Sequence, residues 1–147
     1  MFTTNEFATF RNDPPVVMDA GYVPRFQALA AAAMHRAPEV SDRLLHEIER
    51  ATILPPTDMP LTVVNIGSEV TFRDEESGRE QTIILVLPTE ADIAERRVSV
   101  MTPIGAALIG LAQGASIDWQ TRQGQTRRLT VLRVTTHPMS ELRDPAA

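Results

Sequence analysis

The spacing of apolar residues changes midway along the chain. Between residues 22 and 53, apolar side chains recur every three or four positions, which predicts amphipathic helices. A break at Pro38 divides this region, and Val40, Leu44 and Ile48 then share one side of the second helix. Two such helices joined by a short loop form an antiparallel hairpin, which is the arrangement we expect here.

From residue 69 onward the apolar period becomes that of strands. Alternation predicts short strands over residues 69–73 and 116–120 and a longer last strand over 126–136. Residues 81–87 are apolar on both faces, which indicates a central strand. Two helices followed by a run of strands predict an α+β fold in two lobes.

The most informative pattern is VSVMTPIGAALIGLAQG, residues 98–114. The stretch begins as a short strand and continues into a short helix. Thr102 can accept a hydrogen bond from the amides that follow, and Pro103 fits the first helical position, where an N–H would have no partner. Gly110 suits a left-handed helix end. The small residues Gly105 to Ala107 permit either close packing on a sheet or the close approach of another protein.

Composition narrows the classes of function. The chain has 147 residues and is 43% hydrophobic, enough for one domain or a small domain with an appendage. A net charge of −5 argues against nonspecific nucleic-acid binding, and no specific DNA binding is expected. No cysteine is present, so we expect no disulfide or thiolate chemistry. No apolar run approaches the roughly 20 residues of a membrane span, and no signal pattern opens the chain. We therefore expect a cytoplasmic protein with no membrane partner.

No pattern of catalytic residues stands out. The histidines His35, His46 and His137 lack metal-ligand spacing, and Gly105 and Gly110 do not form a phosphate-binding motif. No serine lies in a nucleophile motif of the Gly-x-Ser-x-Gly type. We therefore expect no cofactor, no metal ion and no catalytic residue, and we do not expect an enzyme.

Two groups of charged residues remain as candidate contact sites. Arginines gather on the last expected hairpin: Arg122, Arg127, Arg128 and Arg133. They form either a solvated face balanced by nearby acids or a basic rim for an acidic partner. Glu39 and Asp42 lie at the expected tip of the helical hairpin. We favour a role for both in the first turn of the second helix, where acids suit the helix dipole, over a shared metal ion.

The pattern of residues 98–114 resembles the Gre transcript-cleavage factors. In their C-terminal domain a strand runs into a Ser-Pro-Ile-(Gly/Ala)-x-Ala-Leu-x-Gly segment, and Thr102 to Gly110 takes that place here. The sequences Val64 to Val70, Ile83 to Val86 and Glu90-Ala91-Asp92 match the same domain in the same order. The resemblance covers roughly residues 60–137. It implies an FKBP-like lobe, an antiparallel sheet curled against a short helix.

Within this superfamily the chain is most similar to the regulators of nucleoside diphosphate kinase, which carry the same lobe after a shortened hairpin. The resemblance implies docking on RNA polymerase near the rim of its secondary channel. It assigns that contact to the strand end and helix start: Met101, Thr102, Pro103, Ile104 and Gly105. RNA polymerase is therefore the expected partner, and nucleoside diphosphate kinase is a second candidate.

Gre factors insert a long coiled coil whose acidic tip helps to hold a catalytic metal ion. Each helix of the expected hairpin has roughly fifteen residues and, at about 1.5 Å per residue, spans about 22 Å, around half the reach of that coiled coil. We therefore expect a regulator that binds the channel rim without cleaving transcripts. Two alternatives stay open. One is control of nucleotide metabolism by contact with the kinase or through a small-molecule site, and the other is transcript cleavage through Glu39 and Asp42.

These patterns predict a short N-terminal antiparallel helical hairpin followed by an FKBP-like antiparallel β-sheet lobe with one short helix. The expected segments are an N-terminal arm over 1–21, the hairpin over 22–53, a Pro-rich linker over 54–62, the Gre-type lobe over 63–138 and a tail over 139–147. The arm contains Phe2, Phe7 and Phe10, which we expect to dock on the chain's own fold or on a second copy.

Overall fold

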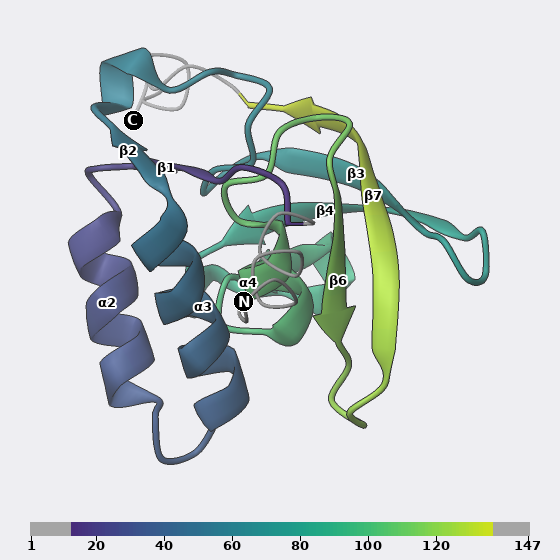
Figure 1. Ribbon diagram of the computed structural model, residues 1–147, viewed down its shortest axis with the longest axis horizontal. Helices are drawn as coiled ribbons and strands as arrows, with labels where there is room; N and C mark the ends of the chain where they lie inside the picture. The colour runs from purple at the N-terminus through teal and green to yellow at the C-terminus, as the bar shows by residue number, and fades with distance from the viewer. Residues whose placement is uncertain (1–12, 137–147) are drawn as a thin grey trace, which may run out of the picture.

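The computed structural model describes residues 13–136 (Figure 1). The three phenylalanines of the arm and the predicted tail lie outside these residues. The helices are α2 (Val23–Ala32), α3 (Pro38–Arg50) and α4 (Pro103–Leu108). The strands are β1 (Val17–Asp19), β2 (Thr52–Leu54), β3 (Glu69–Asp74), β4 (Glu80–Val86), β5 (Arg97–Ser99), β6 (Ser116–Gln120) and β7 (Thr126–Thr135). Within residues 13–136, no helix is long and apolar enough to cross a membrane.

The predicted α+β fold is confirmed. Five strands form one curled sheet in the order β5-β4-β3-β7-β6. Its pairs are antiparallel except β4 with β5, which run parallel. The strand predicted to be central, β4, lies beside the short edge strand β5, while β3 occupies the middle. The pairing of β3 with β7 shifts register between Thr71 and Phe72, which adds to the curvature of the sheet.

A second, two-stranded sheet was not predicted. The strands β1 and β2 pair in parallel, so that Val17 faces Thr52 at the base of the helical hairpin. Three-residue strands are too short to show a period in the sequence. The backbone N–H of Val17 also donates to the carbonyl of Gly110 at 3.0 Å. The end of the expected arm and the start of the linker are therefore ordered parts of the fold.

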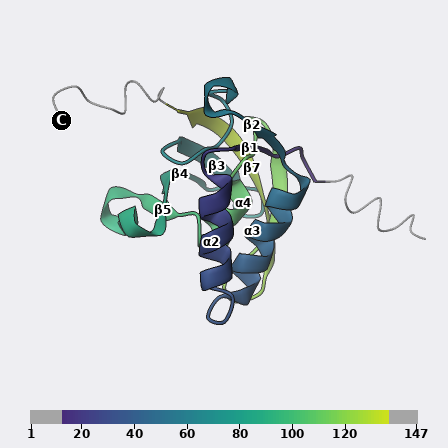
Figure 2. The same ribbon diagram turned by 90° about the vertical axis from the view of Figure 1, so that its left-hand side faces the viewer.

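The helical hairpin lies against the sheet rather than apart from it. One hydrophobic cluster contains Phe26 and Leu44 of the hairpin together with Leu85, Leu108 and Val131 of the sheet and α4. Figure 1 shows α2 and α3 side by side, with α4 between them and the sheet. In the view of Figure 2, the segment that precedes β5 projects away from the helices. The two expected lobes thus share a single core.

The start of α4 has the local structure that the sequence predicts. The Thr102 hydroxyl accepts a hydrogen bond from the N–H of Gly105 at 3.1 Å and donates to the carbonyl of Ser99 at 2.7 Å. Pro103 occupies the first helical position. Gly110 follows the helix with a φ of 85°, the left-handed conformation expected there. The junction of β5 with α4 is therefore tied to its own backbone.

A buried ion pair links the hairpin to its surroundings. The Glu47 side chain is 2% exposed, and its carboxylate lies 2.9 Å from Arg43 Nε and 2.8 Å from Arg50 Nε. Arg43 Nη2 donates to the carbonyl of Asp118 in β6 at 3.1 Å. Arg50 Nη1 donates to the carbonyl of Pro14 at 2.6 Å. One carboxylate therefore orients two arginines that fasten α3 to the sheet on one side and to the N-terminal segment on the other.

Replacing the buried acid tests this link. We expect Glu47→Gln to lower the free energy of unfolding by about 3 kcal/mol, because it leaves two guanidiniums beside a neutral side chain. Urea denaturation followed by Trp119 fluorescence measures the loss. Glu49→Gln is the matched control on the exposed side of the same helix and should change stability by less than about 0.5 kcal/mol. Equal losses in the two variants would contradict this role for Glu47.

A second prediction concerns the packing of α4. A Cβ atom at Gly105 would lie 2.1 Å from the carbonyl oxygen of Ser99 and 2.9 Å from the Cα of Val100. Because both neighbours are backbone, Gly105→Ala should destabilise the protein by about 2 kcal/mol. In Gly21→Ala, the nearest atom to the new Cβ is a side-chain oxygen of Asp19 at 3.2 Å. Thermal unfolding should therefore show a clearly smaller change for this control.

Candidate partner-binding groove

A groove of about 810 Å³ opens where the hairpin tip approaches the lobe. One wall is the start of α3, the opposite wall is the β6–β7 hairpin, and the start of α4 lies between them. Its residues include Glu39, Asp42, Pro103, Trp119 and Arg122. The structure thus brings together residues from all three predicted sets: the strand end, the hairpin tip and the arginine group.

The predicted contact segment at the start of α4 is only partly accessible. Met101, Thr102, Pro103 and Ile104 are half-buried, and Gly105 is buried. Pro103 is the member of this segment that lines the groove. The tight contact of Gly105 with the backbone of Ser99 gives it a packing role. Fewer residues of this segment are therefore accessible to a partner than the five that the sequence pattern indicates.

The two tip acids occupy different turns of α3. Glu39 follows Pro38 in the first turn, where a carboxylate suits the positive end of the helix dipole. Asp42 is the fifth residue of the helix and lies beyond that turn, which corrects the prediction that both acids belong to it. Both side chains are exposed and line the groove. In the described part of the chain, no three histidine, cysteine, aspartate or glutamate side chains gather as a metal site.

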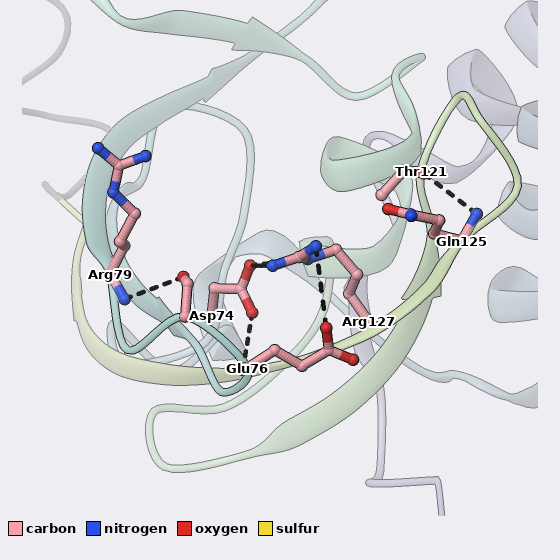
Figure 3. A network of polar contacts seen from close by, with 7 residues as sticks. Asp74, Glu76, Arg79, Thr121, Gln125 and Arg127 are labelled. Atoms are coloured by element: carbon pink, nitrogen blue, oxygen red, sulfur yellow. Dashed lines mark hydrogen bonds and ion pairs between the residues drawn. The ribbon is translucent and has the colours of Figure 1, made fainter.

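The predicted arginine group divides into paired and unpaired members. Arg127 Nη2 lies 2.5 Å from Asp74 Oδ2 and Arg127 Nη1 lies 3.9 Å from Glu76, so it ties β7 to the β3–β4 turn (Figure 3). Arg128 Nη1 lies 3.0 Å from Asp118 Oδ1. Arg122 is exposed and forms no ion pair within residues 13–136. The groove therefore presents Arg122 as an available cation, while Arg127 and Arg128 balance nearby acids.

The β3–β4 turn lowers the pKa values of its carboxylates. Partial burial tends to raise the pKa of Asp74, but the N–H of Glu76 and the Arg127 guanidinium together hold this pKa below its ordinary 3.8. For Glu75, a hydrogen bond from the Thr130 hydroxyl and another from Arg73 keep the pKa below its ordinary 4.5. These contacts stabilise the charged carboxylates and pin the turn to β7.

Sequence reasoning missed two contributors to the groove. Trp119 is half-buried: it packs against the hydrophobic core and also lines the groove. Arg43 lines it too and spans 75 positions of the chain to reach Asp118, which holds the two walls together. The helical pattern shows which side of α3 is polar, but it does not show which strand that side meets.

The fold is that of the Gre-type transcription factors. The family model described as "Transcription elongation factor, GreA/GreB, C-term" matches residues 59–136. The chain belongs to the GreA/GreB family. It is 32% identical over 125 residues to the regulator of nucleoside diphosphate kinase from Escherichia coli (strain K12), a match that covers 85% of this chain and 92% of that protein. The predicted resemblance to both groups is confirmed.

A second sequence relative and one solved structure also resemble this chain. Transcription elongation factor GreA from Chloroflexus aggregans is 37% identical over 91 residues, which are 62% of this chain and 57% of that protein. A solved structure, the prokaryotic transcription elongation factor GreA/GreB from Nitrosomonas europaea, superposes with a TM-score of 0.66 at 33% identity. That superposition covers 84% of this chain and 99% of the other, so the similarity includes the hairpin as well as the sheet.

Acid should weaken the β3–β4 turn. Because folding lowers the pKa values of Asp74 and Glu75, their contribution is fully present above pH 4.5 and is lost as pH falls through the folded-state values. In Arg127→Gln the pKa of Asp74 should rise toward 3.8, and stability should fall less steeply with acid. NMR titration of the Asp74 carboxyl carbon measures the pKa directly. Arg79→Gln is the control, because the Arg79 side chain points away from this pair (Figure 3), and an equal shift in that variant would refute the assignment to Arg127.

Proposed function

We propose that this protein is a transcription regulator that binds RNA polymerase at the rim of the secondary channel. The observation that carries the proposal is the match of residues 59–136 to the GreA/GreB C-terminal family, combined with an open groove lined by Pro103, the first residue of α4. Pro103 belongs to the segment, Met101 to Gly105, where we expect the polymerase contact from the family resemblance. A function on RNA polymerase implies a cytoplasmic protein.

The chemistry of the groove supports a protein partner. Pro103 and half-buried Trp119 supply rigid apolar surface, which often dominates the energy of an interface. Glu39 and Asp42 lie on one wall and Arg122 on the other, so charges of both signs border this apolar surface. A partner with a protruding element bearing charges of both signs would complement these walls.

We further propose that the protein does not stimulate transcript cleavage and is not an enzyme. At about 1.5 Å per residue, the thirteen residues of α3 span about 20 Å. The bond from Arg43 to Asp118 also holds the hairpin against β6. Both features favour a hairpin that stays at the channel entrance and occludes it or competes with longer factors.

A proline substitution tests the docking surface. Pro103→Ala should weaken binding to core RNA polymerase about tenfold, because it removes a ring at the groove while leaving a residue that suits a helix. Biolayer interferometry with immobilised polymerase measures this. Pro56→Ala is the matched control, since Pro56 also begins a short helix but is exposed at a site outside the groove. No measurable binding of the unmodified protein at micromolar concentration would reject the proposed function.

Cleavage is tested on a stalled elongation complex with Mg²⁺. The protein should not shorten the transcript, and it should slow cleavage by an added GreA as it occupies the same rim. In Glu39→Gln with Asp42→Asn the transcript should likewise keep its length, because we assign these acids to the partner contact and not to a metal ion. Transcript shortening that this double variant abolishes would instead establish a cleavage factor.

A second candidate function follows from the names of relatives. The Escherichia coli protein that covers most of this chain is called a regulator of nucleoside diphosphate kinase. Regulation of that kinase by direct contact would appear as a change in its rate when purified protein is added. No change at saturating protein, together with polymerase binding, would favour the first proposal.

A further inference from the structure

A polar pocket lies on the solvent face of the sheet, distinct from the groove. Its volume is about 310 Å³, and it is lined by Glu69, Thr71, Thr82, Arg96, Arg133 and Thr135. These residues come from three adjacent strands and from the turn before β5. The pairing register explains the cluster, because Thr71 of β3 faces Thr82 on one side and Arg133 on the other.

The charged groups of this pocket have no partners among residues 13–136. Arg96, Arg133 and Glu69 form no ion pair or side-chain hydrogen bond there, although other arginines of the same sheet are paired. The hydroxyls of Thr71 and Thr82 bond to each other at 2.8 Å. Two guanidiniums, one carboxylate and the Thr135 hydroxyl thus have no side-chain partner within residues 13–136, and they surround the bonded Thr71–Thr82 pair.

The backbone at Arg96 is unusual. It has a φ of 59°, the one positive value for a residue other than glycine in the described part of the chain. Two hydrogen bonds hold it there: its N–H donates to the carbonyl of Ile93 at 3.0 Å, and its carbonyl accepts from the N–H of Ile84 at 2.8 Å. Arg96 ends the short 3-10 helix Ile93–Glu95, and a left-handed residue is a common way to end a helix. The strand pairing therefore fixes the point from which the Arg96 side chain reaches the pocket.

We propose that this pocket binds a phosphorylated sugar, the chemistry of the ribose phosphate of a nucleotide. Guanidiniums bind phosphate oxygens in bidentate fashion, and threonine hydroxyls can donate to the same oxygens. Glu69 would repel a bare anion, but its carboxylate accepts hydrogen bonds from sugar hydroxyls. The volume lies at the small end of the range for ligand sites, which suits a monosaccharide phosphate. This inference does not depend on polymerase binding.

NMR titration of the full chain with ribose 5-phosphate tests the proposal. The backbone amides of Thr71, Thr82 and Thr135 should shift in a saturable manner below about 10 mM, as for a Kd of about 1 mM or tighter. Ribose and inorganic phosphate should each bind more weakly. Absence of saturable shifts at these amides would overturn the assignment.

Single variants test the contacts to the phosphate and to the sugar separately. Arg133→Gln and Arg96→Gln should each weaken ribose 5-phosphate binding at least about tenfold, because each removes a charged hydrogen-bond donor. Arg79→Gln, at an exposed arginine outside the pocket, should not. Glu69→Gln should weaken ribose 5-phosphate binding but strengthen inorganic phosphate binding. Unchanged melting temperatures establish that the variants fold, and losses as large in Arg79→Gln, or tighter binding of both ligands in Glu69→Gln, would refute the proposed ligand.

Discussion

The architecture depends on a carboxylate that is almost wholly out of contact with water. Glu47 sits between Arg43 and Arg50, and each arginine extends to a backbone carbonyl of a different segment. Burying a charge is unfavourable unless opposite charges accompany it, so the three side chains are stable only as a set. Apolar packing places α3 against α2 and α4, and this set of side chains fixes how α3 is oriented beside β6.

That orientation creates the groove. With α3 held beside β6, the hairpin tip faces the β6–β7 turn, and the start of α4 becomes the floor between them. The N-terminal segment acts from the opposite end, where Val16, just before β1, lies so close to Gly110 that a Cβ added there would be 2.4 Å from Val16 Cγ1. The site that we assign to a protein partner is therefore a product of tertiary contacts on both sides of α4.

The local features of this protein could be predicted from sequence, because their causes are local. The spacing of Val40 and Leu44 predicts α3, and the Thr102-Pro103 pair predicts the start of α4. The GreA/GreB resemblance supplies the curled sheet with one short helix, which periodicity alone does not give, but it does not supply the parallel pairing of β4 with β5. Long-range features could not be predicted in this way. The pairing of β1 with β2 involves three residues on each side, and Arg127 meets Asp74 across 53 positions.

The same reasoning applies to the candidate sites. Sequence indicates which residues are charged, but not that Arg128 is neutralised by Asp118 while Arg122 is exposed. Nor does it show that Thr71, Thr82 and Arg133 share a row, since that depends on register and on the shift after Thr71. Local pattern identified the candidate residues, and only the packed fold sorted them by role.

The parallel pairing of β1 with β2 has an evolutionary implication. The pair joins the start and the end of the helical hairpin, so the hairpin begins and ends at one fixed two-stranded base. Helical turns added or removed near the tip of the hairpin, around residues 33–37, would leave the β1–β2 pair and the five-stranded sheet unchanged. The length of the helical hairpin can thus differ among related proteins without a change elsewhere in the fold, and one fold can carry hairpins of different reach.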